Sequence, residues 1–328
     1  MSSETVIETK RTVQFDLTTS PHLHSGWTTK RVMWFVFLAL VPCIASAVFY
    51  FGFYQLLILA VAIFFAVGTE AAIQKIRKKK FTIDDGSAAL TGLLLAFTLP
   101  PNFSLSATAI GSVVAIAIGK QIFGGLGFNI FNPALVGRAF LQAAFPVAIT
   151  TWTKPNMAVD SVTSATPLAA FKFDKALTEI QPMFLGNIGG CIGETSSLAI
   201  LIGGIFLIVI GIVNWRIPAS MIIGILIFGG IFFLIDPIKY PSPVFQIFAG
   251  GFLFGTFFMA TDWVSSPITG KGMWIFGISI SLIVVIIRIF GGLPEGVMYA
   301  ILFMNGFVPI INRYTKPRIF GTVKEASK

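Results

Sequence analysis

Long apolar runs, many of them close to 20 residues, dominate the sequence from Val32 onward. A helix of about 20 apolar residues matches the roughly 30 Å hydrocarbon core of a bilayer, and it satisfies its own backbone polar groups there. Only 11% of the residues are charged, whereas soluble domains have about 25%. The alternating ten-residue segments of an outer-membrane barrel do not occur in the sequence. The sequence therefore predicts an all-α polytopic membrane protein.

About ten segments are predicted to cross the membrane: 32–51, 55–74, 86–100, 104–121, 133–150, 191–213, 217–235, 244–261, 273–290 and 295–312. The third is short and is flanked by Asp84, Asp85 and a Pro-Pro pair, which favours a half-helix or broken helix enclosed by protein. A cleaved signal peptide is not expected, because the first run is of full spanning length and follows a long polar stretch. An even number of spans places both termini on one side.

Positive charge indicates which side that is. Most of the 23 Lys and Arg residues fall on the side of the termini; the exceptions are Lys154, Lys172, Lys175 and Lys239 on the opposite side, and Arg138 and Arg288 within spans. Cytoplasmic loops carry the excess of Lys and Arg. Both termini are therefore predicted to be cytoplasmic and the loop 151–190 extracytoplasmic. These loops account for the net charge of +9, so nucleic-acid binding is not expected.

Two short sequences recur at an offset of about half the chain. IFGGL occurs at 122–126 and 289–293, and LTGLLLAFT at 90–98 aligns with LFGTFFMAT at 253–261. With five spans in each half, equivalent helices would run in opposite directions, as in inverted-repeat transporters; a chance match of glycine-rich segments is the alternative. The predicted organisation is an N-terminal segment 1–31, a five-helix repeat 32–150, the loop 151–190, a second repeat 191–312 and a tail 313–328.

Metal chemistry is not expected from the few sulfur and imidazole side chains. Cys43 and Cys191 lie in separate apolar segments and are interpreted as small core residues. Two thiolates cannot complete a four-cysteine iron–sulfur cluster without another subunit. His22 and His24 form an HxH pair before the first span, which alone is a weak metal signal.

A glycine-rich stretch with two asparagines, GGLGFNIFNPALVG, occupies 124–137 between the fourth and fifth spans. Asn132 followed by proline fits a helix start, and the glycines allow backbone or a planar ligand to approach closely. The amides of Asn129 and Asn132 can hydrogen-bond the edge of a heterocycle. The alternative is a capped, glycine-packed helix break without a ligand.

Acidic residues near the membrane are functional candidates, because a charge is costly to bury in a bilayer. Glu70 and Glu194 are expected to be embedded, and a cation or proton path through them is a hypothesis. Arg138 and Arg288 are candidates to pair with them. Other carboxylates lie at predicted helix ends, where a solvated or capping role suffices: Asp84, Asp85, Asp236, Asp262 and Glu295.

The loop DSVTSATPLAAF at 160–171 is polar in an otherwise apolar chain. Five of its residues fit the pattern D-x-x-[ST]-[GS]-A-T: Asp160, Thr163, Ser164, Ala165 and Thr166. This pattern resembles the acceptor sequence at which a flavin transferase moves FMN from FAD onto a threonine hydroxyl as a phosphoester. Small neighbours leave the hydroxyl accessible on a flexible segment, and Pro167 favours an extended conformation at Thr166. A plain polar loop is the alternative.

These motifs occur together in the order found in one family. The sequences SPHLH, GGLGFNIFNPALVG, SATPL, IGETSSLAILIGG, ATDWVSSP and IRIFGGLPEGVMYAILFMN resemble the RnfD/NqrB family over nearly the full length. The family includes the D subunit of the Rnf complex, a ferredoxin:NAD⁺ oxidoreductase that moves Na⁺ or H⁺ across the bacterial inner membrane. The B subunit of the Na⁺-translocating NADH:quinone reductase is a relative, but this chain has the length of a D subunit. Many members have Gly where this chain has Ser164.

The resemblance implies an inverted-repeat fold like that of urea transporters and a role in electron transfer. Thr166 would carry FMN on the outer side, and a noncovalent riboflavin would lie near Asn129 and Asn132, with Asp262 a further candidate contact. The chain would relay electrons between ferredoxin and NAD⁺ beside the Rnf A, B, C, E and G subunits. NAD⁺ would bind elsewhere, since no strand followed by GxGxxG occurs. The rival hypothesis is a flavin-free solute channel or transporter with the same bundle.

Overall fold

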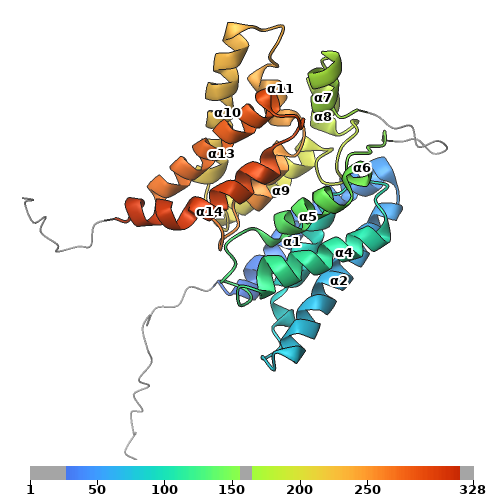
Figure 1. Cartoon of the computed structure of the whole chain (residues 1–328), viewed down its shortest axis with the longest axis vertical. Coiled ribbons are helices and arrows are strands. Elements are labelled where there is room, and N and C mark those ends of the chain that lie inside the picture. Colours follow the sequence, from blue (N-terminus) through green and yellow to red (C-terminus); the bar gives the residue numbers. More distant parts are fainter. Residues whose placement is uncertain (1–26, 156–164, 318–328) are drawn as a thin grey trace, which may run out of the picture.

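The computed structural model describes residues 27–155 and 165–317, and the regular elements within these ranges are helices. Figure 1 shows the N-terminal half of the chain, in blue to green, beside the C-terminal half, in yellow to red. In the described part of the chain, four helices are long and apolar enough to cross a membrane: α1 (Thr29–Phe51), α2 (Tyr54–Ile76), α10 (Arg216–Ile235) and α13 (Gly270–Phe290). The chain is therefore a polytopic α-helical membrane protein.

Shorter helices make up the rest of the bundle. In the first half these are η1 (Ile83–Asp85), α3 (Ser87–Phe97), α4 (Leu105–Ile116), its π-helical continuation η2 (Ala117–Gln121), α5 (Pro133–Ala144) and α6 (Pro146–Ile149). A central group consists of α7 (Pro167–Ala169), the π-helical turn η3 (Ala170–Asp174) and α8 (Ile180–Leu185). The second half contains α9 (Ser197–Ile210), α11 (Pro243–Phe248), α12 (Phe252–Phe254), η4 (Gly255–Met259) and α14 (Val297–Thr315).

Several predicted spans differ from the observed helices. Segment 133–150 is divided into α5 and α6 at Phe145, because Pro146 has no backbone N–H to continue the helix. Segment 244–261 is divided into α11, α12 and η4, with a left-handed backbone at Gly250 (φ 67°) between the first two. Segment 191–213 becomes helical only at α9. Broken helices of this kind occur at membrane depth where protein surrounds them.

The short helix α3 ends inside the bundle, and later parts of the chain satisfy its terminal carbonyl groups. The Phe97 carbonyl accepts a hydrogen bond from the Gly193 amide (2.8 Å), and the Thr98 carbonyl accepts one from the Arg138 guanidinium. The last carbonyl groups of a helix have no partner within the helix, and lipid offers none. These contacts explain how an 11-residue helix can end within the membrane bundle.

An arginine has the same role in the second half. The Arg288 guanidinium donates to the carbonyl oxygens of Gln246 and, at 2.9 Å, Ala249, which close the short helix α11. Arg288 was a candidate partner for Glu70 or Glu194. In the described part of the chain it forms no ion pair with either within 4.0 Å and instead caps the C-terminal end of α11. Arg138 combines its capping bond with a position 3.9 Å from Glu194.

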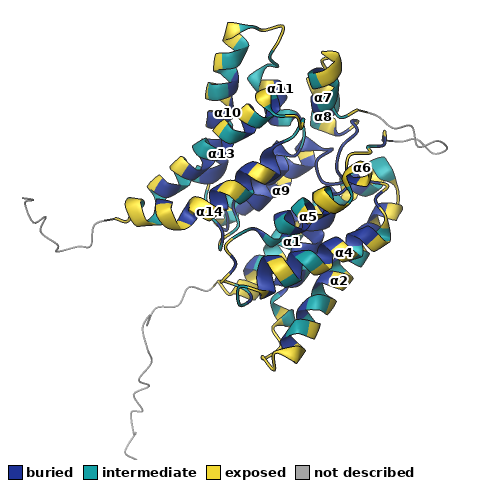
Figure 2. Ribbon diagram, viewed as in Figure 1, coloured by how far each residue is buried: buried dark blue, intermediate teal, exposed yellow. Residues whose placement is uncertain are grey.

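Helices α1 and α9 form the most extensive helix–helix contact between the two halves. Gly203 of α9 lies directly against the backbone carbonyl of Ala39 in α1, where a Cβ atom would clash. Small residues allow such close helix packing in membranes. Around this centre, α2 packs on α3 and α4 in the first half, and α10 packs on α13 in the second. Large apolar side chains remain exposed on the outer helix faces (Figure 2), as at Phe64, Val209 and Leu234, which fits contact with lipid.

Candidate flavin sites

Two pockets lie where the halves of the chain meet. We call the first the asparagine pocket; it is bordered by the beginning of α1, the loop before α5, the end of α9 and the loop after η4, and it contains Asn129 and Asn132. The second, the arginine pocket, is bordered by α5, the segment before α9, α12 and the beginning of α14, and it contains Arg138. Both have the concave form of small-molecule sites.

The asparagine pocket brings together the three residues predicted to contact riboflavin, Asn129, Asn132 and Asp262. Protein atoms leave about 820 Å³ of space there, part of which is open solvent at its mouth. Phe257 and Trp263 add aromatic surface to a largely apolar lining. Amide and carboxyl groups among largely apolar side chains can bind the edge of a heterocycle, so these groups fit a flavin ring.

The two asparagines have different roles. Asn132 Oδ1 accepts hydrogen bonds from the Ala134 amide (3.0 Å) and the Leu135 amide (3.4 Å) as the cap of α5, while its Nδ2 donates to the Met259 carbonyl (3.2 Å). The helix-start prediction for Asn132 is thus confirmed, and the same amide joins α5 to η4. Asn129 donates to the Phe131 carbonyl (3.1 Å) within its own loop. Asn129 is therefore the better residue with which to test ligand binding without disturbing a helix.

Asp262 lies in the loop after η4. Its Oδ2 accepts hydrogen bonds from the Ser265 hydroxyl (2.7 Å) and the Ser265 amide (3.3 Å). Burial raises the pKa of Asp262, and the hydrogen bonds from Ser265 act in the opposite direction. The carboxyl group is thus fixed in one orientation at the wall of the asparagine pocket.

A buried ion pair joins this pocket to Glu70. Lys120 lines the pocket, and its Nζ lies 2.8 Å from Glu70 Oε1 and 2.5 Å from the Ser87 hydroxyl. Gln121 Nε2 also donates to Glu70, at 2.8 Å. Glu70 is buried within the protein, with 1% exposure, and its partner is Lys120; its position within the membrane stays a prediction. Sequence reasoning missed this role, because a single lysine at a predicted span end is typical of a cytoplasmic loop.

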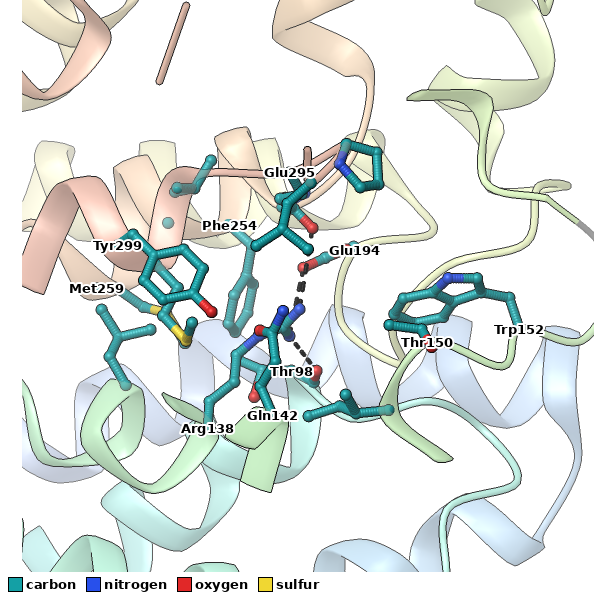
Figure 3. Close-up of a pocket in the computed structure, with 18 residues that line it drawn as sticks. Thr98, Arg138, Gln142, Thr150, Trp152, Glu194, Phe254, Met259, Glu295 and Tyr299 are labelled. Atoms are coloured by element: carbon teal, nitrogen blue, oxygen red, sulfur yellow. Dashed lines mark hydrogen bonds and ion pairs between the residues drawn. The ribbon is translucent and has the colours of Figure 1, made fainter. Parts of the chain in front are cut away.

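In the arginine pocket, Arg138 faces two carboxylates (Figure 3). It lies 3.9 Å from Glu194 Oε1 through Nη1 and 3.9 Å from Glu295 Oε2 through Nη2. Nη1 also lies 3.2 Å from Cys191 Sγ. The Gly251 amide at the start of α12 donates to the Glu295 carboxylate. Glu194 was predicted to be embedded and is 8% exposed, whereas Glu295 was predicted to be a helix-end residue and instead belongs to this cluster.

Thr166, the predicted FMN attachment residue, is half-buried beside the arginine pocket. It caps the three-residue helix α7, where Thr166 Oγ1 accepts a hydrogen bond from the Ala169 amide (3.2 Å). Its small adjoining pocket shares four lining residues with the arginine pocket: Trp152, Glu194, Pro294 and Glu295. Ala165 is exposed. Several other predicted residues lie outside the described part of the chain: Asp160, Thr163, Ser164, His22 and His24.

Lys172 holds the Thr166 segment in place. Its Nζ donates to the carbonyl oxygens of Arg288 (3.1 Å), Gly291 (2.5 Å) and Leu293 (2.8 Å), at the end of α13 and in the loop that follows. Partial burial lowers the pKa of Lys172. The segment that follows Thr166 is therefore anchored to the C-terminal end of α13, shortly before Glu295. The sequence had predicted a flexible loop around Thr166.

Comparison with known proteins places the chain in one family. Residues 16–321 match the model of the NQR2, RnfD, RnfE family. The sequence is 46% identical to the D subunit of a proton-translocating ferredoxin:NAD(+) oxidoreductase complex from Clostridium ljungdahlii, with 94% of this chain and 96% of that protein covered. It is also 46% identical, with the same coverage, to the D subunit of a Na(+)-translocating complex from Acetobacterium woodii. Identity to the D subunit of an ion-translocating oxidoreductase complex from Actinobacillus succinogenes is 38%, with 94% and 98% covered.

Proposed function

Because this chain belongs to the NQR2, RnfD, RnfE family, we propose that it is the flavin-carrying D subunit of an ion-translocating ferredoxin:NAD⁺ oxidoreductase complex. Two relatives that share most of its length are D subunits of ion-translocating ferredoxin:NAD(+) oxidoreductase complexes, and a third is the D subunit of an ion-translocating oxidoreductase complex. The chain is one membrane component of an oxidoreductase and depends on other subunits for the full reaction. The other Rnf subunits, A, B, C, E and G, are its partners, and a flavin transferase matures it.

Two flavins give the chain its redox chemistry in this proposal. Thr166 Oγ1 forms a phosphoester with FMN as the pyrophosphate bond of FAD breaks and AMP leaves, and riboflavin occupies the asparagine pocket without a covalent bond. When bound, both flavins supply one- and two-electron redox chemistry. The observation that carries the proposal is the position of these residues: Thr166 and the pair Asn129 and Asn132 each adjoin a pocket at the junction of the two halves.

The proposed topology follows from the same arrangement. Equivalent helices of two inverted five-helix repeats give ten passes through a bacterial inner membrane, with both termini in the cytoplasm. The matching order of helices supports this layout: α4 packs on α5 and on α2 in the first half, and α13 packs on α14 and on α10 in the second. The asparagine pocket then opens toward the cytoplasm, and Thr166 lies on the outer face. Flavins held at Thr166 and in the asparagine pocket would then lie near opposite membrane surfaces.

Replacing Asn129 with alanine is expected to lower the riboflavin content of the purified chain while the covalent FMN stays. Loss of one hydrogen bond to the flavin ring in a buried site lowers the binding free energy by about 1.4 kcal/mol, which is about a tenfold loss of affinity. Acid precipitation releases noncovalent flavin, and chromatography measures it. Asn214→Ala is the control, since Asn214 does not line the pocket and its Oδ1 accepts a local hydrogen bond from the Arg216 amide. Equal riboflavin in both variants would contradict the assignment.

A cysteine in place of Phe173 is expected to react with a membrane-impermeant maleimide in intact cells. Phe173 is 67% exposed in the segment after Thr166, and both native cysteines are buried, so background labelling is low. A cysteine in place of Lys79, an exposed residue between α2 and α3, is the matched control and should label only after lysis. The reverse pattern would overturn the proposed orientation.

A further inference from the structure

A further pocket lies where α10 and α13, two of the helices that are long and apolar enough to cross a membrane, both end. Phe232 near the end of α10 packs on Phe290 at the end of α13, with ring centroids 5.7 Å apart. The pocket is bordered by η3, the loop after α10, α11 and the last turn of α13. Protein atoms leave about 690 Å³ of space there, part of which is open solvent at its mouth. This pocket at the membrane surface is called the lysine pocket, after Lys172, Lys175 and Lys239.

Four positively charged side chains line the lysine pocket: Lys172, Lys175, Lys239 and Arg288. Among the described residues, no aspartate or glutamate lines the pocket, and no carboxylate oxygen lies within 4.0 Å of any of the four charged groups. Lys172 donates to three backbone carbonyl groups, which are neutral and leave its charge uncompensated. Asp236 accepts hydrogen bonds from two backbone amides of its own loop. A concave site with an excess of positive charge attracts an anion.

Aromatic rings hold the two exposed lysines beside the pocket. Lys175 Nζ lies 5.2 Å from the centroid of the Phe171 ring and donates to the Lys239 carbonyl at 3.5 Å. Lys239 Nζ lies 5.4 Å from the centroid of the Tyr240 ring. Both rings line the pocket, and an ammonium group is attracted to an aromatic face at such distances. Two separate segments, the end of η3 and the loop after α10, thus bring their charges to one place.

The inner wall of the pocket contains a buried charge. Arg288 is 7% exposed, and its guanidinium is held by the carbonyl groups of Gln246 and Ala249. In the described part of the chain, Arg288 Nε and Gln246 Oε1 are buried without a hydrogen-bond partner. An unpaired buried polar group is costly, and it often indicates a water or an ion that binds beside it. The protein alone therefore does not satisfy the polar groups of this wall.

Apolar side chains surround the charged pocket. Leu234 at the end of α10, Ile238 in the loop that follows and Phe290 at the end of α13 are all exposed. Exposed apolar side chains at the ends of membrane spans contact acyl chains. A free phosphate ion would use the charged groups alone, whereas a phospholipid would place its phosphate on the lysines and its acyl chains on these side chains. The combination of charged and apolar groups therefore favours a lipid.

We propose that the lysine pocket binds the phosphate group of an anionic phospholipid, with Lys175 and Lys239 as its contacts and Arg288 as the charge of the inner wall. Lysine binds phosphate as a point charge, and basic pockets between membrane helices bind phospholipid head groups. The lipid fills the space between η3 and the ends of α10 and α13, and so braces the segment that follows Thr166. This site goes beyond the proposed function, because it requires no flavin at Thr166.

Native mass spectrometry of the full-length chain in detergent measures the lipid that stays bound. Dioleoylphosphatidylglycerol is expected to bind at one saturable site, and dioleoylphosphatidylcholine, whose choline cancels the phosphate charge, much more weakly. The double variant Lys175→Gln with Lys239→Gln is expected to weaken phosphatidylglycerol binding by about 30-fold, which is about fivefold for each lysine. Lys172 and Arg288 stay in place because they hold backbone carbonyl groups.

The matched control replaces two exposed lysines that do not line the pocket, as Lys154→Gln with Lys271→Gln. It removes the same charge and should bind phosphatidylglycerol as the native chain does. An equal loss in both double variants would overturn the proposal, since binding would then follow net charge alone. Equal binding of the two lipids by the native chain would overturn it as well, whether or not the variants fold.

Inorganic phosphate separates the two sources of the same anion. It is expected to bind far more weakly than phosphatidylglycerol, because it makes no contact with the exposed apolar side chains. Phosphate that binds as tightly as the lipid and is lost in the Lys175 and Lys239 variant would overturn the lipid as the occupant. The fluorescent band of covalent FMN on a denaturing gel is independent of these results, so the lipid site and the proposed function can fail separately.

Discussion

Thr166→Val is expected to abolish covalent FMN, so that the fluorescent band of the chain on a denaturing gel disappears and its intact mass falls to that of the bare polypeptide. Valine has nearly the shape of threonine but no hydroxyl, and the hydroxyl oxygen is the atom that forms the phosphoester. The change also removes the hydrogen bond from the Ala169 amide to Thr166 Oγ1. Loss of a helix cap costs about 1 kcal/mol, which is too little to unfold a bundle of this size.

Two controls separate the lost chemistry from a disturbed fold. Thr166→Ser keeps a hydroxyl at the same position and should keep both the cap and the fluorescent band. Thr151→Val changes a nearby threonine, which is exposed and whose hydroxyl donates to the Val147 carbonyl, and should leave the band unchanged. If fluorescence persists in Thr166→Val, another residue is the acceptor, and the assignment of Thr166 is wrong.

The sequence predicted the membrane class and most helix positions because apolar length is a local property. Helices α1, α2, α10 and α13 lie within a few residues of their predicted spans. The broken segments were harder to predict, since their ends depend on partners far along the chain. The end of α3 needs Arg138, and the end of α11 needs Arg288. Only the folded chain shows which carbonyl groups these arginines reach.

For the candidate sites, too, local features were predicted from the sequence and contacts between distant residues were not. Asn132 and its proline gave a local helix-start signal, and the structure places the cap there. Glu70 was predicted to be embedded from its apolar neighbours, but its partner Lys120 is 50 residues away and lies at the end of an apolar run. Glu295 likewise joined the Arg138 cluster through the fold. The sequence therefore predicted which single residues are functional candidates. It did not predict which oppositely charged residues they contact.

Lys120→Met is expected to destabilise the chain severely, because it leaves Glu70 as an unpaired buried charge. The two side chains are 2% and 1% exposed and lie 2.8 Å apart. Removal of one partner from a buried ion pair costs about 3–5 kcal/mol. Thermal unfolding of the purified chain in detergent should show a large drop in midpoint, and the yield of folded protein from membranes should fall. Lys271→Met, at an exposed position, should change stability by no more than about 0.5 kcal/mol.

The double variant Lys120→Met with Glu70→Gln is expected to recover most of the lost stability. Replacement of both partners by neutral groups of similar volume removes the desolvation cost together with the attraction, and such exchanges are often neutral or stabilising. Glutamine at position 70 also keeps an amide oxygen that can accept from Gln121 Nε2, which now donates to Glu70 at 2.8 Å. A rescue would mean that the pair exists to neutralise Glu70, which argues against a free carboxylate on a cation path at this position. If the double variant were as unstable as Lys120→Met, the unpaired charge of Glu70 would not be the cause of the loss, and the ion-pair explanation would be wrong.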